Sequence, residues 1–166
     1  MNVQRVLLAV ATVALVTVAV VRYSHTNRGW KTIDLFSGRA SVSVPAAWEH
    51  LRADANEEDW GSEDGLYDLY TNWNRGKASR AVIDRLYKLE YHGDRASIAS
   101  RSVHLAGGDA LVYTVTFSQG GRELRDWDYY FDRAGRTYYL GYSCPRAAAS
   151  KFQPVVLRSA KSVRFR

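Results

Sequence analysis

The sequence has 166 residues, a formal net charge of +6 and one cysteine, Cys144. A single cysteine excludes an intramolecular disulfide and any zinc or iron–sulfur site that needs several thiolates. The charge is unevenly spread, because residues 54–68 hold seven acids and no base. The chain is therefore basic with one acidic segment. Its arginines stand singly, without a run of bases or a recognition motif, so we expect no nucleic-acid partner.

The first 24 residues are predicted to form a single transmembrane helix that acts as a signal anchor. Residues 6–21 carry no charge and lie between Arg5 and Arg22. As a helix this apolar core would be about 24 Å long, slightly short of a hydrocarbon core of about 30 Å, and flanking residues can extend it. The predicted anchor residues are Val6, Leu7, Leu8, Val10, Val13, Leu15, Val16, Val18, Val20, Val21 and Tyr23.

A cleaved secretory signal peptide is the alternative to an anchor. Cleavage needs small residues one and three positions before the cleaved bond. The nearest candidate, Thr17-Val18-Ala19, lies inside the apolar run and is a poor site. We therefore expect a single-pass protein of the bacterial inner (cytoplasmic) membrane. Residues 25–30 would be a juxtamembrane linker, and residues 31–166 one α+β domain.

The two flanks of the apolar segment indicate opposite orientations. Arg22, Arg28 and Lys31 follow it and only Arg5 precedes it, so the positive-inside rule would keep the domain in the cytoplasm. A short N-terminal tail with one arginine is instead the usual signal-anchor arrangement, which exports the part of the chain after the anchor. We expect export, with the domain on the extracytoplasmic (periplasmic) side.

The first half of the domain has the pattern of short strands. Residues 31–36 and 39–44 are predicted to form a hairpin, because apolar and polar residues alternate in the second segment. Residues 54–64 show little periodicity and are interpreted as a long surface loop. Residues 66–73 have strand composition. Residues 79–91 fit a helix or a strand, and we favour a strand because the flanking segments are strands.

The second half is predicted to be an antiparallel meander followed by a helix. Turns that contain glycine separate its four strands, residues 98–105, 110–118, 123–131 and 137–142. Residues 146–160 are predicted to form a helix that Pro154 kinks or splits, and a last short strand follows it. The fold class is therefore α+β, with an antiparallel sheet flanked by helices after a single N-terminal transmembrane helix.

Two segments resemble the PsbP-like fold family. Residues 41–49 read SVSVPAAWE, and residues 135–165 read GRTYYLGYSCPRAAASKFQPVVLRSAKSVRF. This order of elements is similar to that of the photosystem II extrinsic protein PsbP and of DcrB-type and LpqN-type bacterial proteins. The bacterial members are often lipoproteins, whereas no lipobox cysteine follows the apolar segment here. The resemblance implies an accessory, binding or chaperone role on membranes or membrane complexes, and it implies no reaction.

No residue set in the sequence has the pattern of a catalytic or metal site. The four histidines are isolated from one another, and neither a nucleophile elbow nor a phosphate-binding glycine loop occurs. Asp126 and Asp128 alternate with aromatic residues, so we expect them on the solvent-facing side of a strand, where Arg125 and Arg136 could pair with that face. We expect no enzyme activity, no cofactor and no metal ion.

The aromatic content points to a partner surface. The chain has 11 tyrosines and five tryptophans, and adjacent tyrosines of a strand must point to opposite faces. We therefore expect a non-catalytic, membrane-anchored accessory subunit that docks on or stabilises a larger membrane protein complex, with photosynthetic and electron-transfer complexes as candidates. The alternative is an extracytoplasmic ligand-binding or chaperone module for a lipid or hydrophobic peptide, and an enzyme of undetected mechanism is third. The candidate partner surface consists of Glu57, Glu58, Asp59, Trp60, Glu63, Asp64, Tyr67 and Trp73.

Overall fold

A computed structural model describes residues 29–54, 56–91 and 96–166. The predicted anchor, residues 1–24, and most of the predicted linker lie outside this part of the chain. Within the described residues no helix is long and apolar enough to cross a bilayer. The division into anchor, linker and domain therefore stays a prediction.

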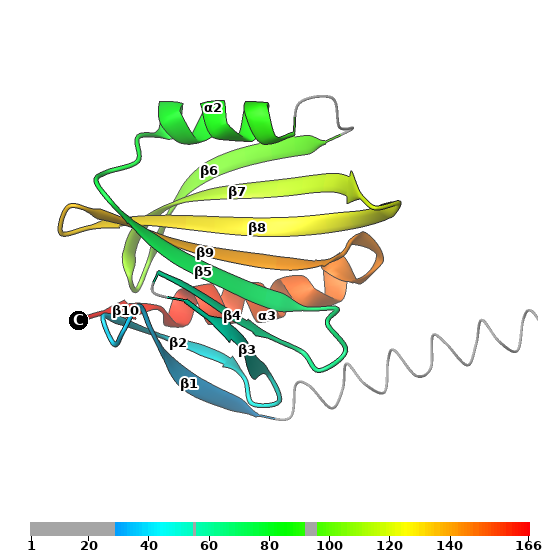
Figure 1. The fold of residues 1–166 in the computed structure, drawn as a ribbon, viewed down its shortest axis with the longest axis horizontal. Coiled ribbons are helices and arrows are strands. Elements are labelled where there is room, and N and C mark those ends of the chain that lie inside the picture. Colours follow the sequence, from blue (N-terminus) through cyan, green and yellow to red (C-terminus); the bar gives the residue numbers. More distant parts are fainter. Residues whose placement is uncertain (1–28, 55, 92–95) are drawn as a thin grey trace, which may run out of the picture.

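In the part of the chain that the structure describes, two antiparallel sheets and two α-helices form the fold (Figure 1). The large sheet contains β3 (Glu49–Ala53), β4 (Glu57–Gly61), β5 (Asp68–Arg75), β6 (Ser97–Leu105), β7 (Gly108–Gln119), β8 (Arg122–Arg133) and β9 (Arg136–Pro145). Its strand order is β3-β4-β5-β9-β8-β7-β6. The small sheet has the order β1-β2-β10, formed by β1 (Trp30–Leu35), β2 (Ala40–Pro45) and β10 (Arg164–Phe165). The predicted antiparallel α+β class is confirmed.

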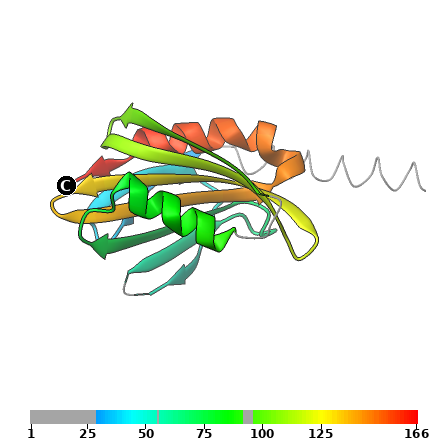
Figure 2. The same cartoon turned by 90° about the horizontal axis from the view of Figure 1, so that it is seen from above.

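The helices lie on opposite faces of the seven-stranded sheet. Helix α3 (Ala149–Ser162) follows the short 3-10 helix η1 (Arg146–Ala148), and with the small sheet it covers one face. Helix α2 (Arg80–Glu90) covers part of the other face. In Figure 2, α3 (orange to red) runs along one side of the molecule, whereas α2 (green) lies over the opposite face of the strands. The sheet is therefore the middle layer of three.

The main core lies between the large sheet and the layer that contains α3. Trp127, Tyr129 and Phe131 of β8 alternate along the strand and are all buried in this core. Phe152 of α3 is 1% exposed, and its ring lies 6.0 Å from the Trp127 ring. A smaller cluster under α2 contains Ile83 and Tyr87 of the helix.

Residues 79–91 form a helix, so the favoured strand prediction is wrong. Ser79 caps the helix, because its side-chain oxygen accepts a hydrogen bond from the Val82 amide. Ile83 and Tyr87 are four residues apart and both face the sheet, where they are buried. The helical spacing therefore decides the conformation, although strands flank the segment.

Two further expectations fail for local reasons. The predicted loop at residues 54–64 contains β4, which pairs with β3 on one side and with β5 on the other. The charged sequence of this segment does not have the alternating pattern of a strand. Backbone hydrogen bonds to the strands on both sides stabilise its extended conformation. Helix α3 runs unbroken from Ala149 to Ser162 with Pro154 inside it. Pro154 therefore does not split the helix, and the expected kink stays a prediction.

Replacing the central aromatic residue of α3 should destabilise the fold strongly. Phe152→Ala leaves a cavity beside Trp48, Tyr67 and Trp127, whose rings surround Phe152. We expect the free energy of unfolding to fall by about 3–5 kcal/mol in urea denaturation. The neighbouring exposed residue provides the control, since Gln153→Ala should change stability by no more than about 0.5 kcal/mol. A loss below about 1 kcal/mol for Phe152→Ala would contradict this core.

Candidate binding groove

The face of the large sheet that α2 partly covers is rich in carboxylates. The alternation that buries Trp127 and Tyr129 towards α3 sends Asp126 and Asp128 to the α2 side. In the strand register, Ser143 of β9 lies between Asp68 of β5 and Asp126 of β8. Three neighbouring strands therefore each contribute polar groups to one row.

Asp128 is the most buried of these carboxyls and connects α2 to the sheet. It is 3% exposed, and it accepts hydrogen bonds from the Tyr87 hydroxyl at 2.5 Å and the Tyr139 hydroxyl at 2.7 Å. Burial raises the pKa of Asp128 to about 7. The expectation of a solvent-facing Asp128 is wrong, because α2 covers it. Within the described residues neither Asp126 nor Asp128 forms an ion pair with an arginine.

Asp68 and Asp126 lie near the open end of the same face. The Ser143 hydroxyl donates a hydrogen bond to Asp126 Oδ1 at 2.7 Å. Burial raises the pKa of Asp126 to about 6, and the charge of Asp68 adds to this shift. Burial and the charge of Asp59 likewise raise the pKa of Asp68 to about 6. These carboxylates repel one another, so a cation placed among them would relieve the repulsion.

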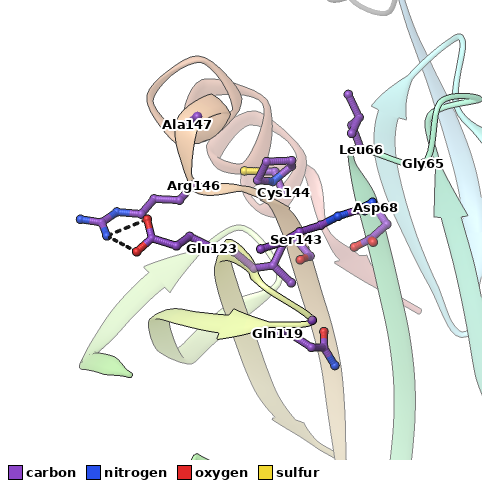
Figure 3. A pocket seen from close by; sticks show the side chains of 13 residues that line it. Gly65, Leu66, Asp68, Gln119, Glu123, Ser143, Cys144, Arg146 and Ala147 are labelled. Carbon is purple, nitrogen blue, oxygen red and sulfur yellow. Dashed lines mark hydrogen bonds and ion pairs between the residues drawn. The ribbon is translucent and has the colours of Figure 1, made fainter. Parts of the chain in front are cut away.

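The carboxylates line two adjoining cavities, which we call the acidic groove. One cavity of about 360 Å³ is lined by Tyr70, Leu86, Glu90, Asp126 and Tyr139, among others. The second, of about 780 Å³, is lined by Asp68 and Ser143 and has the paired Glu123 and Arg146 at its rim (Figure 3). Arg122 also lines this second cavity, so the excess of carboxylates lies in the first. The hydrogen bond between Ser143 and Asp126 joins the linings of the two cavities.

Two residues of the predicted partner surface extend this groove. Glu57 pairs across the strands with Asn72, and Asp59 pairs with Tyr70, so both acids share the α2 face of the sheet. Asp59 Oδ1 is buried and has no hydrogen-bond partner among the described residues. Arg52 of the neighbouring strand lies 3.8 Å from Glu57. Asp59 therefore adds a carboxylate to this face of the sheet, although its Oδ1 atom is closed to solvent.

The other six residues of the predicted surface lie elsewhere. Four are partly buried on the α3 side, and Glu58 accepts a hydrogen bond from the Phe36 amide there. The Trp60 ring stacks on His50, and the Tyr67 ring lies against Phe152. The Trp73 ring faces the guanidinium groups of Arg39 and Arg136. Glu63 and Asp64 lie in the connection between β4 and β5. The structure thus splits the set between two faces, and its role in partner binding stays a prediction.

The groove offers binding chemistry suited to cations. Carboxylates pair with ammonium or guanidinium groups. Tyr70 and Tyr139 line the same cavity as Asp126. The described residues contain no group of three His, Cys, Asp or Glu side chains placed to hold a metal ion. Both oxygens of Asp128 accept hydrogen bonds from tyrosines, so this carboxyl is a buried part of the groove's lining. Asp126 is less buried and is therefore the more accessible carboxyl for a ligand.

Sequence reasoning missed Asp68 as a site residue and dismissed Asp126 and Asp128. The alternation of acids and aromatic residues in β8 was the available signal, since it separates two faces. It does not show that a helix covers one of them.

The raised pKa values predict that the protein loses stability as pH rises. An unfolded aspartate has a pKa near 3.9, whereas folding raises the pKa of Asp68 and Asp126 to about 6 and of Asp128 to about 7. The folded state therefore binds more protons between about pH 4 and pH 7. We expect the free energy of unfolding to fall by at least about 2 kcal/mol from pH 5 to pH 8 in urea denaturation.

Asp126→Asn tests this assignment, because it keeps an acceptor for the Ser143 hydroxyl and removes the titrating charge. The variant should show a shallower pH slope and greater stability than the wild type at pH 8. Asp109→Asn is the control, since the Asp109 side chain is 91% exposed. A stability that stays level or increases across this pH range would contradict the assignment.

Comparisons with known proteins agree on the fold. The solution structure of cyanobacterial PsbP (CyanoP) from Synechocystis sp. PCC 6803 matches with a TM-score of 0.61 and 10% identity, over 82% of this chain and 92% of that one. The Saccharomyces cerevisiae Ran-binding protein Mog1p matches with a TM-score of 0.59 and 9% identity, over 82% and 95%. A Bacteroides thetaiotaomicron structure matches with a TM-score of 0.60 and 12% identity, over 82% and 48%.

No protein-family model matches the chain, and no curated protein matches its sequence. At these identities the structural matches show the fold and not the function. The resemblance to PsbP is confirmed at this level, and the described domain has the fold shared by CyanoP and Mog1p.

Proposed function

We propose that this protein is a non-catalytic accessory subunit that docks on a larger membrane protein complex. The acidic groove would receive a cationic segment of that complex. The observation that supports this function is the gathering of six carboxylates on the α2 side of the molecule, from β4, β5, β8 and α2. They are Glu57, Asp59, Asp68, Glu90, Asp126 and Asp128.

The length of the groove favours a polypeptide segment over a small cation. Asp68 lines the cavity at one end of β5, and Asn74 lines the cavity at the other. At about 3.3 Å per residue this distance along the strand is roughly 20 Å, which suits about six residues of extended chain. A single amine would contact the carboxylates in only one part of the groove. A segment with two or more lysines or arginines could pair with carboxylates at both ends.

The side of α2 next to the groove adds an apolar wall. Val82, Leu86 and Leu89 are 52%, 57% and 66% exposed, and their spacing places them along one side of the helix. Leu86 lines the cavity that contains Asp126. Exposed apolar residues grouped beside charged ones are typical of a partner site. The bound segment would therefore combine basic residues with apolar ones.

The predicted anchor would hold this module at the inner membrane, with the domain on the extracytoplasmic side. A tether of this kind raises the effective concentration of the groove at its partner, so modest affinity in the groove is sufficient. The fold shared with CyanoP is compatible with an accessory role.

The alternative is a ligand-binding or chaperone module. The apolar wall formed by Val82, Leu86 and Leu89 favours a hydrophobic peptide as its ligand. A lipid is less well supported, because charged side chains line the two cavities of the groove and also a further cavity of about 550 Å³ between α2 and the ends of β6 and β8.

Co-purification tests the docking function. The full chain is isolated from its membranes in mild detergent after chemical cross-linking, and bound proteins are identified by mass spectrometry. Asp59→Asn combined with Asp126→Asn should reduce recovery of the partner about tenfold, which corresponds to about 1.4 kcal/mol. Asp34→Asn with Asp109→Asn removes the same charge outside the groove and should leave recovery unchanged. Equal recovery with both double variants, or a monomer without co-purifying membrane protein, would refute the proposal.

A further inference from the structure

The end of the chain forms a basic surface on the side of the sheet opposite the acidic groove, apart from Arg146, which lies at the rim of the larger cavity of the groove. Residues 146–166 contain six basic residues and no acidic one. They make up η1, α3 and β10 and belong to the layer that covers the core face of the large sheet. We infer that this layer binds anionic lipid headgroups, so that the domain lies with α3 against the membrane surface.

Helix α3 separates its apolar and basic residues between two faces. Phe152, Val155 and Val156 are buried against the sheet. Lys151, Arg158 and Lys161 are exposed, and spacings of seven and three residues place them on one side of the helix. A helix that buries one face in its own domain can present the opposite face to a flat charged surface without any change of fold.

The basic residues of this layer have few acidic neighbours. Arg146 pairs with Glu123 at 3.1 Å, and Arg166 pairs with Asp34 at 2.7 Å. Arg158 and Lys161 form no ion pair with any residue that the structure describes. Positive charge in excess of its local partners attracts an anionic surface.

The path of the chain favours lipid over an acidic protein as the occupant. The small sheet, whose first strand begins at Trp30, lies in the same layer as α3. The Arg158 guanidinium lies over the Trp30 ring, 4.1 Å from its centroid. The chain therefore enters the domain beside the basic face of α3. An anchor that ends near residue 24 would leave at most about 20 Å of linker, which keeps this face close to the headgroups.

This orientation would turn the acidic groove away from the bilayer. The large sheet lies between α3 and α2, so contact of α3 with lipid leaves the α2 side free for a partner. Anionic lipid attracts the basic residues of α3 and repels the carboxylates of the groove, and both effects favour this orientation of the domain. The inference rests on the proposed membrane attachment, and it deepens the proposed function by fixing which face meets the partner.

Fluorescence quenching in vesicles tests the inference. The full chain is reconstituted into phosphatidylcholine vesicles, with or without about one third phosphatidylglycerol, that contain a lipid with a nitroxide headgroup. A fluorophore is attached at Gln153→Cys on α3 or at Ala81→Cys on α2, two exposed positions on opposite sides. The native Cys144 is buried and its thiol pKa is raised to about 12, so the unsubstituted chain serves as the labelling blank.

We expect several-fold stronger quenching at position 153 than at position 81 in the anionic vesicles. The difference should disappear in pure phosphatidylcholine and in about 0.5 M salt, where charge attraction is screened. It should also disappear in Lys151→Gln with Lys161→Gln. The matched control, Arg85→Gln with Lys88→Gln on α2, should retain it. Equal quenching at both positions in anionic vesicles, or a difference that ignores lipid charge, would overturn the inference.

Flotation of the same vesicles separates this inference from the proposals on which it rests. Failure to float with phosphatidylcholine would refute the anchor alone. Flotation with phosphatidylglycerol that depends on Lys151 and Lys161 would still support the basic face. Quenching without preference for position 153, together with flotation and recovery of a partner, would refute the basic face and leave the docking function intact.

Discussion

The hydrogen bonds that Asp128 accepts from Tyr87 and Tyr139 are the constraint on which the groove depends. They join α2 to β8 and β9 through a carboxyl that is almost completely buried. Burial of a carboxylate is unfavourable without partners, and its raised pKa reflects this penalty. Tyr139 donates from the neighbouring strand β9, but the Tyr87 hydroxyl offsets the penalty only when α2 lies in its observed position. The network therefore fixes where the helix lies, and with it the wall of the groove.

The width of the sheet explains why a groove exists at all. Seven strands at about 4.8 Å spacing span roughly 30 Å, whereas a helix with its side chains is about 10 Å wide. The small sheet and α3 together cover the core face. Among the described elements only α2 lies on the other face, over Tyr113 and Val115 of β7 and Asp128 of β8. The part of that face formed by β5 and β9 stays open. Because this part is uncovered, its polar residues can form hydrogen bonds with water or with a partner.

Sequence reasoning predicted most of the strands, the α+β class and the helix at the end of the chain. These elements show clear alternation or are bounded by glycine and proline. It failed at residues 79–91, where apolar spacing fitted two periods, and at β4, whose sequence EEDWG has no strand pattern without its neighbours. The groove could not be predicted from the sequence, because Asp68 and Asp126 are 58 positions apart in the chain. They come together only through the pairing of both strands with β9. No local pattern encodes that meeting.

The same sheet keeps opposite charges apart in a chain whose net charge is +6. Six carboxylates gather on the α2 side, and the basic residues of α3 and β10 lie on the other. Asp126 and Arg158 form no ion pair within the described domain; Asp126 accepts a hydrogen bond from Ser143, and Arg158 lies over the Trp30 ring. The carboxylates of the groove and the basic residues of α3 lie on opposite sides of the sheet, although α2 itself also carries Arg80, Arg85 and Lys88. This arrangement suits a protein that lies between two differently charged surfaces.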